Sequence, residues 1–99
     1  MAGTKHPSGT ATVQIDNERV RVTEWRFQAG EATGHHTHGF DYAVIPTASG
    51  TLRIVAPDGT ASTAELTVGQ PYYRNAGVEH DVINADNHEV SFIEVEIKT

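Results

Sequence analysis

The chain has 99 residues, of which 13 are acidic, 7 are basic and 6 are histidine, and it contains no cysteine. This length suits one domain with a single core and leaves no room for separate cofactor and substrate domains. The acidic balance, without any run of Lys or Arg, excludes nucleic acid and anionic membrane surfaces as expected partners, and the lack of thiols restricts metal ligands to imidazole and oxygen.

The N-terminal stretch MAGTKHPSG lacks the apolar segment of a signal peptide, and no apolar stretch is long enough to span a bilayer. We therefore expect a cytoplasmic protein with no membrane partner. Residues 1–10 are expected to be disordered, and residues 11–99 are expected to form a single domain.

Apolar and polar residues alternate in several short stretches between turn signals, and no window has helical spacing. This pattern predicts an all-β protein with almost no helix. The expected strands are, in chain order, residues 12–15, 18–28, 35–45, 52–54, 61–68, 72–74, 80–84 and 89–97. Short strands at such even spacing are typical of a sandwich or barrel.

The second expected strand has apolar residues of both parities. Val20 and Val22 share one face, whereas Trp25 and Phe27 lie on the other. A bulge at residues 23–24 would turn all four inward, and bulges of this kind suit a curved or closed sheet. The sequence therefore predicts a bulge there.

Further along, residues 46–50 are expected to be a loop, and Pro57-Asp58-Gly59 is a strong signal for a hairpin turn. We interpret the acids Glu89, Glu94 and Glu96 of the last strand as a solvated face. Asn84 is expected to support backbone hydrogen bonds. The aromatic residues interpreted as core or interface residues rather than substrate contacts are Trp25, Phe27, Tyr72, Tyr73 and Phe92.

Three of the histidines fall within the segment GHHTHGFDYAV. Residues i and i+2 of a strand point to the same face, so His36 and His38 project side by side, as two ligands of one metal ion would, while His35 points the other way. A pair of this kind is more often a surface feature, so a metal site needs a third partner. His80 is the candidate for that partner.

Two stretches around these histidines resemble the paired motifs of the cupin superfamily. In the first motif of the family, two histidines are followed by a glutamate and then a glycine; in the second, a proline usually precedes a third histidine. The matching stretches here are Gly30-x5-His36-x-His38-x4-Ala43-x6-Gly50 and Gly69-x5-Asn75-x-Gly77-x2-His80-x3-Asn84. The resemblance covers nearly the whole chain.

This resemblance implies a single cupin-type β-barrel, the jelly-roll or double-stranded β-helix fold, in which His36, His38 and His80 bind one metal. Imidazole suits divalent transition metals, which leaves Fe, Mn, Ni, Cu and Zn open. Two stretches, FDYAVIP and AGVEHDVINA, are similar to the small single-domain cupins known as β-alanine degradation proteins.

The chain departs from the motif where the glutamate should stand. Depending on the spacing, Tyr42 or Ala43 occupies that position. Asp41 remains a possible ligand only if the chain bulges at Gly39, because strand parity sends it to the opposite face. Tyr42 shares parity with the histidines, so we predict that its phenol points toward the metal or its bound water and is the candidate catalytic group. A neutral phenol binds metals poorly but donates hydrogen bonds.

The missing carboxylate has an electrostatic consequence. Three neutral imidazoles around a divalent ion leave a site charge near +2, whereas a carboxylate ligand would lower it to about +1. A small anionic ligand is therefore the expected partner. Arg74 and Arg53 would pair with such an anion if their side chains faced the site, a question that strand parity across two loops leaves open.

Several functions fit this site. The leading one is a metal-dependent enzyme acting on a small carboxylate or dicarbonyl compound; the resemblance implies dioxygenase-like chemistry first, with lyase or isomerase chemistry behind it. The alternatives are a non-catalytic module that binds metal and a small ligand as sensor or carrier, a β-alanine degradation accessory protein, and a metal-free cupin whose histidines perform acid-base work. We also expect a homodimer, since edge strands need covering.

Overall fold

The computed structural model describes residues 6–99, and these form strands and turns but no helix. None of them forms a helix long and apolar enough to cross a membrane. The strands are β1 (Thr10–Asp16), β2 (Val20–Phe27), β3 (His36–Thr37), β4 (Asp41–Ala48), β5 (Gly50–Val55), β6 (Ala61–Leu66), β7 (Tyr72–Arg74), β8 (Glu79–Asn84) and β9 (Val90–Ile97).

The N-terminal stretch that we expected to be disordered falls partly within this range. Residues 1–5 lie outside the described residues. Beyond them, the amide of Ala32 donates to the carbonyl of Pro7 at 2.9 Å, and the amide of Gly9 donates to the carbonyl of Ala32 at 2.9 Å. The chain is therefore hydrogen-bonded to the barrel just before β1 begins.

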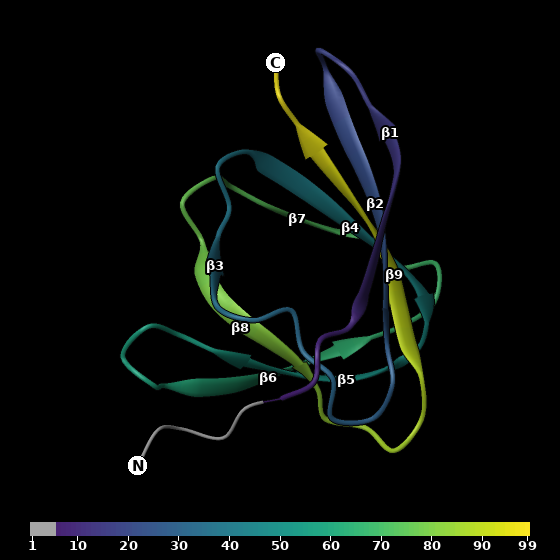
Figure 1. The fold of residues 1–99 in the computed structure, drawn as a ribbon, viewed down its shortest axis with the longest axis vertical. Coiled ribbons are helices and arrows are strands. Elements are labelled where there is room, and N and C mark those ends of the chain that lie inside the picture. Colours follow the sequence, from purple (N-terminus) through teal and green to yellow (C-terminus); the bar gives the residue numbers. More distant parts are fainter. Residues whose placement is uncertain (1–5) are drawn as a thin grey trace.

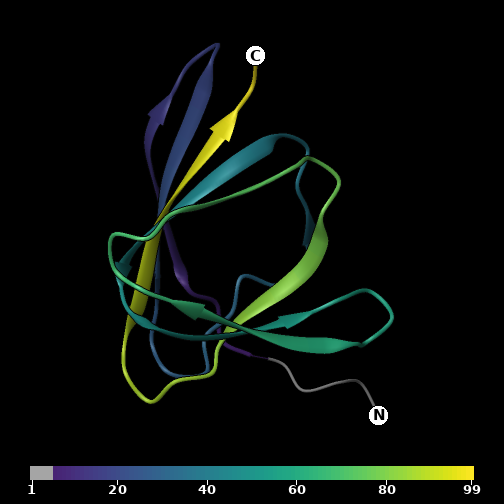
Figure 2. The ribbon, with the colours of Figure 1, turned by 180° about the vertical axis from the view of Figure 1, so that it is seen from behind.

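The strands form two antiparallel sheets that face each other around a common interior (Figure 1). One sheet has the order β1-β2-β9-β4-β7 and the other has the order β3-β8-β5-β6. The last strand, β9, lies between β2 and β4, which brings the first and last strands into one sheet; the view from behind shows the same arrangement (Figure 2). The prediction of an all-β barrel is confirmed.

The core lies between the two sheets and is built from alternate residues of most strands. Its buried members are Phe27, Tyr42, Val44, Leu52, Leu66, Val82, Val90 and Phe92. The ring of Phe27 stacks on Trp25 and on Phe92, with centroids 5.4 and 5.7 Å apart. Burial of each large apolar side chain contributes about 1.5–3 kcal/mol, so this cluster fixes the inward face of every strand that it includes.

The bulge predicted in the second strand is wrong. β2 pairs with β9 without interruption, and the register shift lies instead in β1, between Val13 and Ile15. Val20 and Val22 consequently point to the outer face of the sheet, opposite to Phe27. No bulge is needed because β9 also carries apolar side chains on its outer face, beside these two valines.

The single strand predicted for residues 35–45 is also wrong. The chain forms β3 and β4 in different sheets, separated by residues 38–40. The backbone of His38 is hydrogen-bonded to the loop before β8: its amide donates to the carbonyl of Val78 at 2.8 Å, and its carbonyl accepts from Gly77 at 2.8 Å. Gly39 and Phe40 then carry the chain across to the other sheet.

The loop predicted at residues 46–50 is reduced to a single residue, because β4 continues to Ala48 and β5 begins at Gly50. A side chain at Gly50 would collide with the buried Val90, so this close approach requires glycine. The turn predicted at Pro57-Asp58-Gly59 is confirmed: the amide of Ala56 donates to the carbonyl of Thr60 at 2.8 Å, and Gly59 has a φ of 88°.

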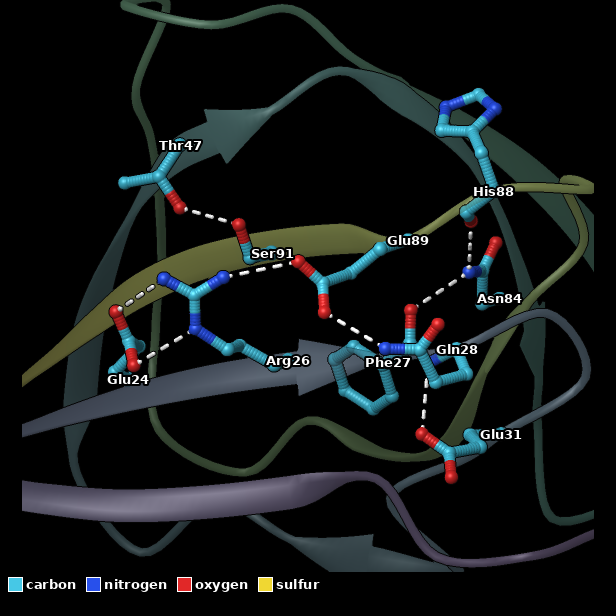
Figure 3. Close-up of polar contacts among 10 residues, drawn as sticks. All are labelled: Glu24, Arg26, Phe27, Gln28, Glu31, Thr47, Asn84, His88, Glu89 and Ser91. Carbon is cyan, nitrogen blue, oxygen red and sulfur yellow. Dashed lines mark hydrogen bonds and ion pairs between the residues drawn. The ribbon is translucent and has the colours of Figure 1, made fainter.

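A buried amide joins three segments at one end of the barrel (Figure 3). Asn84, which is 1% exposed, donates through Nδ2 to the carbonyls of Phe27 at 3.0 Å and His88 at 2.8 Å. Its Oδ1 accepts from the amide of Asp86 at 2.9 Å. The expected backbone role of Asn84 is confirmed, and these bonds connect β2, β8 and the loop that leads to β9.

Candidate metal centre

The three histidines of the two motifs converge on one point inside the barrel. His36 on β3 lies directly opposite His80 on β8 in the antiparallel pair, and His38 follows β3. The Nε2 atom of His38 lies 3.0 Å from Nε2 of His36 and 3.2 Å from Nε2 of His80. Three imidazole nitrogens from two segments of the chain therefore face one another.

These separations match those of ligands around one transition metal. Zinc and similar ions bind imidazole nitrogen at about 2.0–2.1 Å, so two such ligands at right angles lie about 3.0 Å apart. Ligand nitrogens of His36, His38 and His80 all lie within 4.8 Å of one another. The donor set present thus fits a divalent transition metal.

The hydrogen bonding of His36 also suits a metal ligand. Its Nδ1 lies 2.8 Å from the carbonyl oxygen of Gly34, which only accepts, so Nδ1 carries the proton and donates it. Nε2 then presents a lone pair toward the other two histidines. An imidazole that binds metal through one nitrogen usually donates its other N–H to a carbonyl or carboxylate.

Burial keeps the other two imidazoles neutral. It lowers the pKa of His38 to about 4, an effect that neighbouring His36 increases and Glu96 opposes. Burial likewise lowers the pKa of His80 to about 4, with further lowering from the nearby histidines. Both rings are therefore unprotonated at neutral pH, which is the form that binds a metal.

Tyr42 lies inside the barrel beside the histidines, although the strand that was expected to carry all of them is broken. Its ring, 3% exposed, stacks on His38 with centroids 3.8 Å apart. Burial raises the pKa of its phenol to about 12, with Tyr72 and Glu94 raising it further and Arg74 opposing. The hydroxyl therefore stays protonated and is available as a donor.

Two neighbouring residues lie away from this cluster. The carboxylate of Asp41 accepts from the hydroxyl of Tyr73 at 2.7 Å and from the amide of Ala76 at 2.7 Å. These two bonds lower the pKa of Asp41, the Ala76 amide having the larger effect. His35 is exposed and pairs with Glu79 at 3.0 Å.

The histidines open onto a cavity of about 270 Å³ between the sheets. Most of its wall is apolar, and such a wall limits the number of water molecules around a bound ion or ligand. Among its lining residues are three of the aromatic residues expected to be core, which are Trp25, Tyr72 and Phe92. These rings are packed in the core and also face the cavity.

The interpretation of Glu94 and Glu96 as part of a solvated face is wrong, because both line this cavity. On β9 they share the inward parity of Phe92, and the apolar residues between them face outward. That parity was the available signal, since a core residue at position 92 places positions 94 and 96 inside. Glu89 remains outside, where it pairs with Arg26 at 2.9 Å (Figure 3).

The two inward acids differ in their electrostatic state. Glu96 accepts two hydrogen bonds from Arg21, at 2.7 and 3.0 Å, which balance its charge. Burial raises the pKa of Glu94 to about 7, and Glu96 raises it further while Arg21 opposes. Glu94 is thus an inward-facing carboxyl poised between its two protonation states near neutral pH.

His38 links the acids to the histidine cluster. A ring nitrogen of His38 and carboxylate oxygens of Glu94 and Glu96 lie within 4.8 Å of one another. The cavity is therefore lined by two groups of side chains whose atoms are of the kind that bind metals, and the two groups share His38. No carboxylate stands at the glutamate position of the first motif on β4, and the carboxylates nearest His38 in this group come from β9.

Comparison with known proteins identifies relatives of this chain in sequence and in structure. None of the family models matches the sequence. The chain is 55% identical over 92 residues, 93% of its length, to the β-alanine degradation protein BauB of Pseudomonas aeruginosa, covering 96% of that protein.

Solved structures share the barrel fold of this chain. A cupin domain from Bordetella pertussis superimposes with a TM-score of 0.91 at 52% identity, covering 98% of this chain and 100% of that one. A conserved protein with a double-stranded β-helix domain from Klebsiella pneumoniae shares the fold, with a TM-score of 0.74 at 16% identity over 97% of this chain and 82% of that one. With this identity, coverage and barrel topology, the chain belongs to the cupin superfamily.

Proposed function

We propose that the protein binds one divalent transition metal through His36, His38 and His80 and acts on a small anionic carboxylate or dicarbonyl compound, with dioxygenase-like chemistry as the leading reaction type. The observation that carries this proposal is the convergence of three imidazole nitrogens at 3.0 and 3.2 Å at a cavity whose wall is mostly apolar. When bound, such a metal supplies Lewis-acid polarisation of a substrate oxygen or, as iron, a centre that reacts with dioxygen.

The residues around the histidines have separate roles in this proposal. The protonated phenol of Tyr42 donates a hydrogen bond to the ligand, which is the catalytic role predicted for it. Glu94 holds or accepts a proton within the cavity, because its pKa of about 7 is close to the working pH. The carbonyl of Gly34 keeps the Nδ1 proton on His36, so that Nε2 remains a lone-pair donor.

Metal analysis of untagged protein, purified without chelator, tests the metal site. We expect about one equivalent of metal in the native chain and none in His36→Ala or His80→Ala, since each removes one of only three protein ligands. Two matched controls, His35→Ala and Asp41→Ala, should retain the metal because both side chains point away from the cluster. Full retention of metal in His80→Ala would contradict the proposed site.

A second candidate function is a non-catalytic module that binds a metal and a small ligand. The short connection beside the histidines, residues 38–40 between β3 and β4, favours it, because so short a segment offers no lid to close over a reacting substrate. Dioxygen uptake and substrate loss with iron-loaded protein distinguish the two functions. Binding of small carboxylates without turnover under any of the five metals would favour the module.

The relative from Pseudomonas aeruginosa suggests the metabolic process in which this chain takes part. Its name links it to the degradation of β-alanine, and we propose that this chain acts on or binds a short acid of the same kind in the cytoplasm. β-Alanine degradation by cells lacking the protein tests this role. Normal growth of those cells on β-alanine as sole nitrogen source would refute it.

We also propose a homodimer. Every residue of the edge strand β1 is exposed, including Val13 and Ile15, at 56% and 50%. Such an edge favours pairing with a second copy. Light scattering should give the mass of a dimer at micromolar concentration, and a monomer would refute the proposal.

A further inference from the structure

A second cavity adjoins the one that contains the histidines. It has a volume of about 400 Å³ and extends along β6 and β7. The two cavities share the lining residues Tyr42, Ile54, Tyr72 and His80. A ligand in this outer cavity would therefore contact His80 at its inner end.

Arg74 on β7 lines the outer cavity. It lies directly opposite Tyr42 in the antiparallel pairing of β4 and β7, so the two side chains project to the same, inner side of the sheet. Its guanidinium carbon lies 4.6 Å from the centroid of the Tyr72 ring, and its Nη1 donates to the carbonyl of Tyr73 at 2.9 Å. The side chain is exposed, and these two contacts direct its guanidinium over the Tyr72 ring at the mouth of the outer cavity.

Arg74 differs from the other residues around the two cavities in its positive charge. Among the described residues that line either cavity, it is the only Lys or Arg. In residues 6–99, carboxylates pair with Arg21, Arg26 and Lys98, and Arg74 is not part of these ion pairs. Arg53, the other arginine that strand parity left open, is exposed on β5, as Arg74 is on β7, but it lines neither cavity.

One cross-strand row connects Arg74 to the metal-ligating residues. Tyr42 pairs with Arg74 on one side and with Glu96 on the other, and its ring stacks on His38. An anion held by the guanidinium would thus lie one aromatic ring away from the histidine cluster. A guanidinium binds a carboxylate through two parallel hydrogen bonds, which also orients the rest of the molecule.

We propose that Arg74 anchors the carboxylate of a short acid in the outer cavity, so that a second oxygen of the same molecule faces the histidines. This inference rests on the proposed function and specifies its ligand: a short carboxylic acid with an additional oxygen group, bound by one carboxylate at Arg74. The uncharged analogue of such an acid lacks the anchored group and binds weakly.

Calorimetric titration of zinc-loaded protein with malonate and with its neutral analogue malonamide tests the anchor. Arg74→Gln should weaken malonate binding about tenfold or more, the loss expected when a charge-assisted hydrogen bond is removed. Arg74→Lys should give an intermediate affinity, because lysine keeps the charge but not the planar fork. The matched control, Arg53→Gln, should bind malonate as the native chain does.

A variant in the opposite direction strengthens the test. Glu65 also lines the outer cavity, where its carboxylate accepts from the hydroxyl of Thr51 at 2.8 and 3.0 Å. Removing this negative charge in Glu65→Gln should tighten malonate binding, since like charges near an anion site oppose it. Malonamide binding should change little in any of these variants.

The outcomes separate this inference from the proposed function. Equal malonate affinity in Arg74→Gln and the native chain, or no malonate binding by the native chain at millimolar concentration, would overturn the anchor even with metal bound. If the native chain binds no metal, the same titrations are carried out on the metal-free protein. Malonate binding that still depends on Arg74 would then support the anchor while refuting the metal centre.

Discussion

Replacing Glu94 by Gln should stabilise the metal-free protein, and only at neutral and higher pH. Glutamine keeps the shape of the side chain and removes the charge that the native chain acquires in its interior. Burial raises the pKa of Glu94 from 4.5 to about 7. Because a tenfold change in proton affinity corresponds to about 1.4 kcal/mol, ionising this carboxyl in the folded state costs about 3 kcal/mol.

The sign of the effect follows from the raised pKa. Below pH 4.5 the carboxyl is protonated in both the folded and the unfolded chain, and its contribution to stability is fully present. As the pH rises toward 7, the unfolded chain releases the proton before the folded chain does, and this contribution is lost. Glutamine has no such dependence, so the two free energies of unfolding should diverge by about 2–3 kcal/mol between about pH 4 and pH 8.

Urea unfolding of chelator-treated protein at several pH values measures this divergence. For a domain of this length, about 1 kcal/mol corresponds to roughly 4–8 °C in Tm, so thermal scans should show a shift of about 10–20 °C at about pH 8. Glu18→Gln is the control, because Glu18 lies exposed in the turn between β1 and β2. Parallel pH profiles for the native chain and Glu94→Gln would refute the assignment of Glu94 to the interior.

Three further changes have defined outcomes. Metal-free Glu94→Gln, which lacks the opposing contribution of Glu94, should lose stability in urea unfolding as the pH falls from 6.5 toward about 4, because unfolded histidines take up protons that His38 and His80 in the folded chain do not; a flat profile of this variant would contradict the lowered pKa values. Asn84→Ala should cost about 2–4 kcal/mol in the same assay, since the buried carbonyls of Phe27 and His88 lose their donor. Gly50→Ala should lower the free energy of unfolding by about 1–3 kcal/mol through collision with Val90, and an unchanged Tm would show that the strand shifts freely.

The class of fold was predictable because alternation alone specifies antiparallel strands with one buried face. The rule fails where a strand is apolar on both faces. In β2 the valines at positions 20 and 22 face outward, and the bulge proposed to bring them inward does not exist. A single sequence does not distinguish an apolar outer face from a disturbed register, since both produce mixed parity.

The convergence of the three histidines was predictable from the spacing of His36 and His38 and from the motif that contains His80, whereas the neighbouring Glu94 was missed for a different reason. Spacing within HxH requires two imidazoles on one side of an extended segment, and this holds although β3 has only two residues. Glu94 was assigned to the surface because ionised carboxylates are rarely buried. A raised pKa removes much of that cost, and the size of the rise depends on the surrounding walls, which the sequence alone does not describe.

The shortness of β3 affects how the barrel wall opens. Two of the three converging imidazoles, those of His36 and His38, lie on or just after a strand that pairs with β8 through two residues only, whereas that of His80 lies on β8 itself. Segments with so few backbone pairings exchange their amide hydrogens through local fluctuations well below the energy of global unfolding. A cation bound by histidines of both segments would join β3 to β8. The rate at which ligands enter and leave would then depend on how tightly that cation is bound.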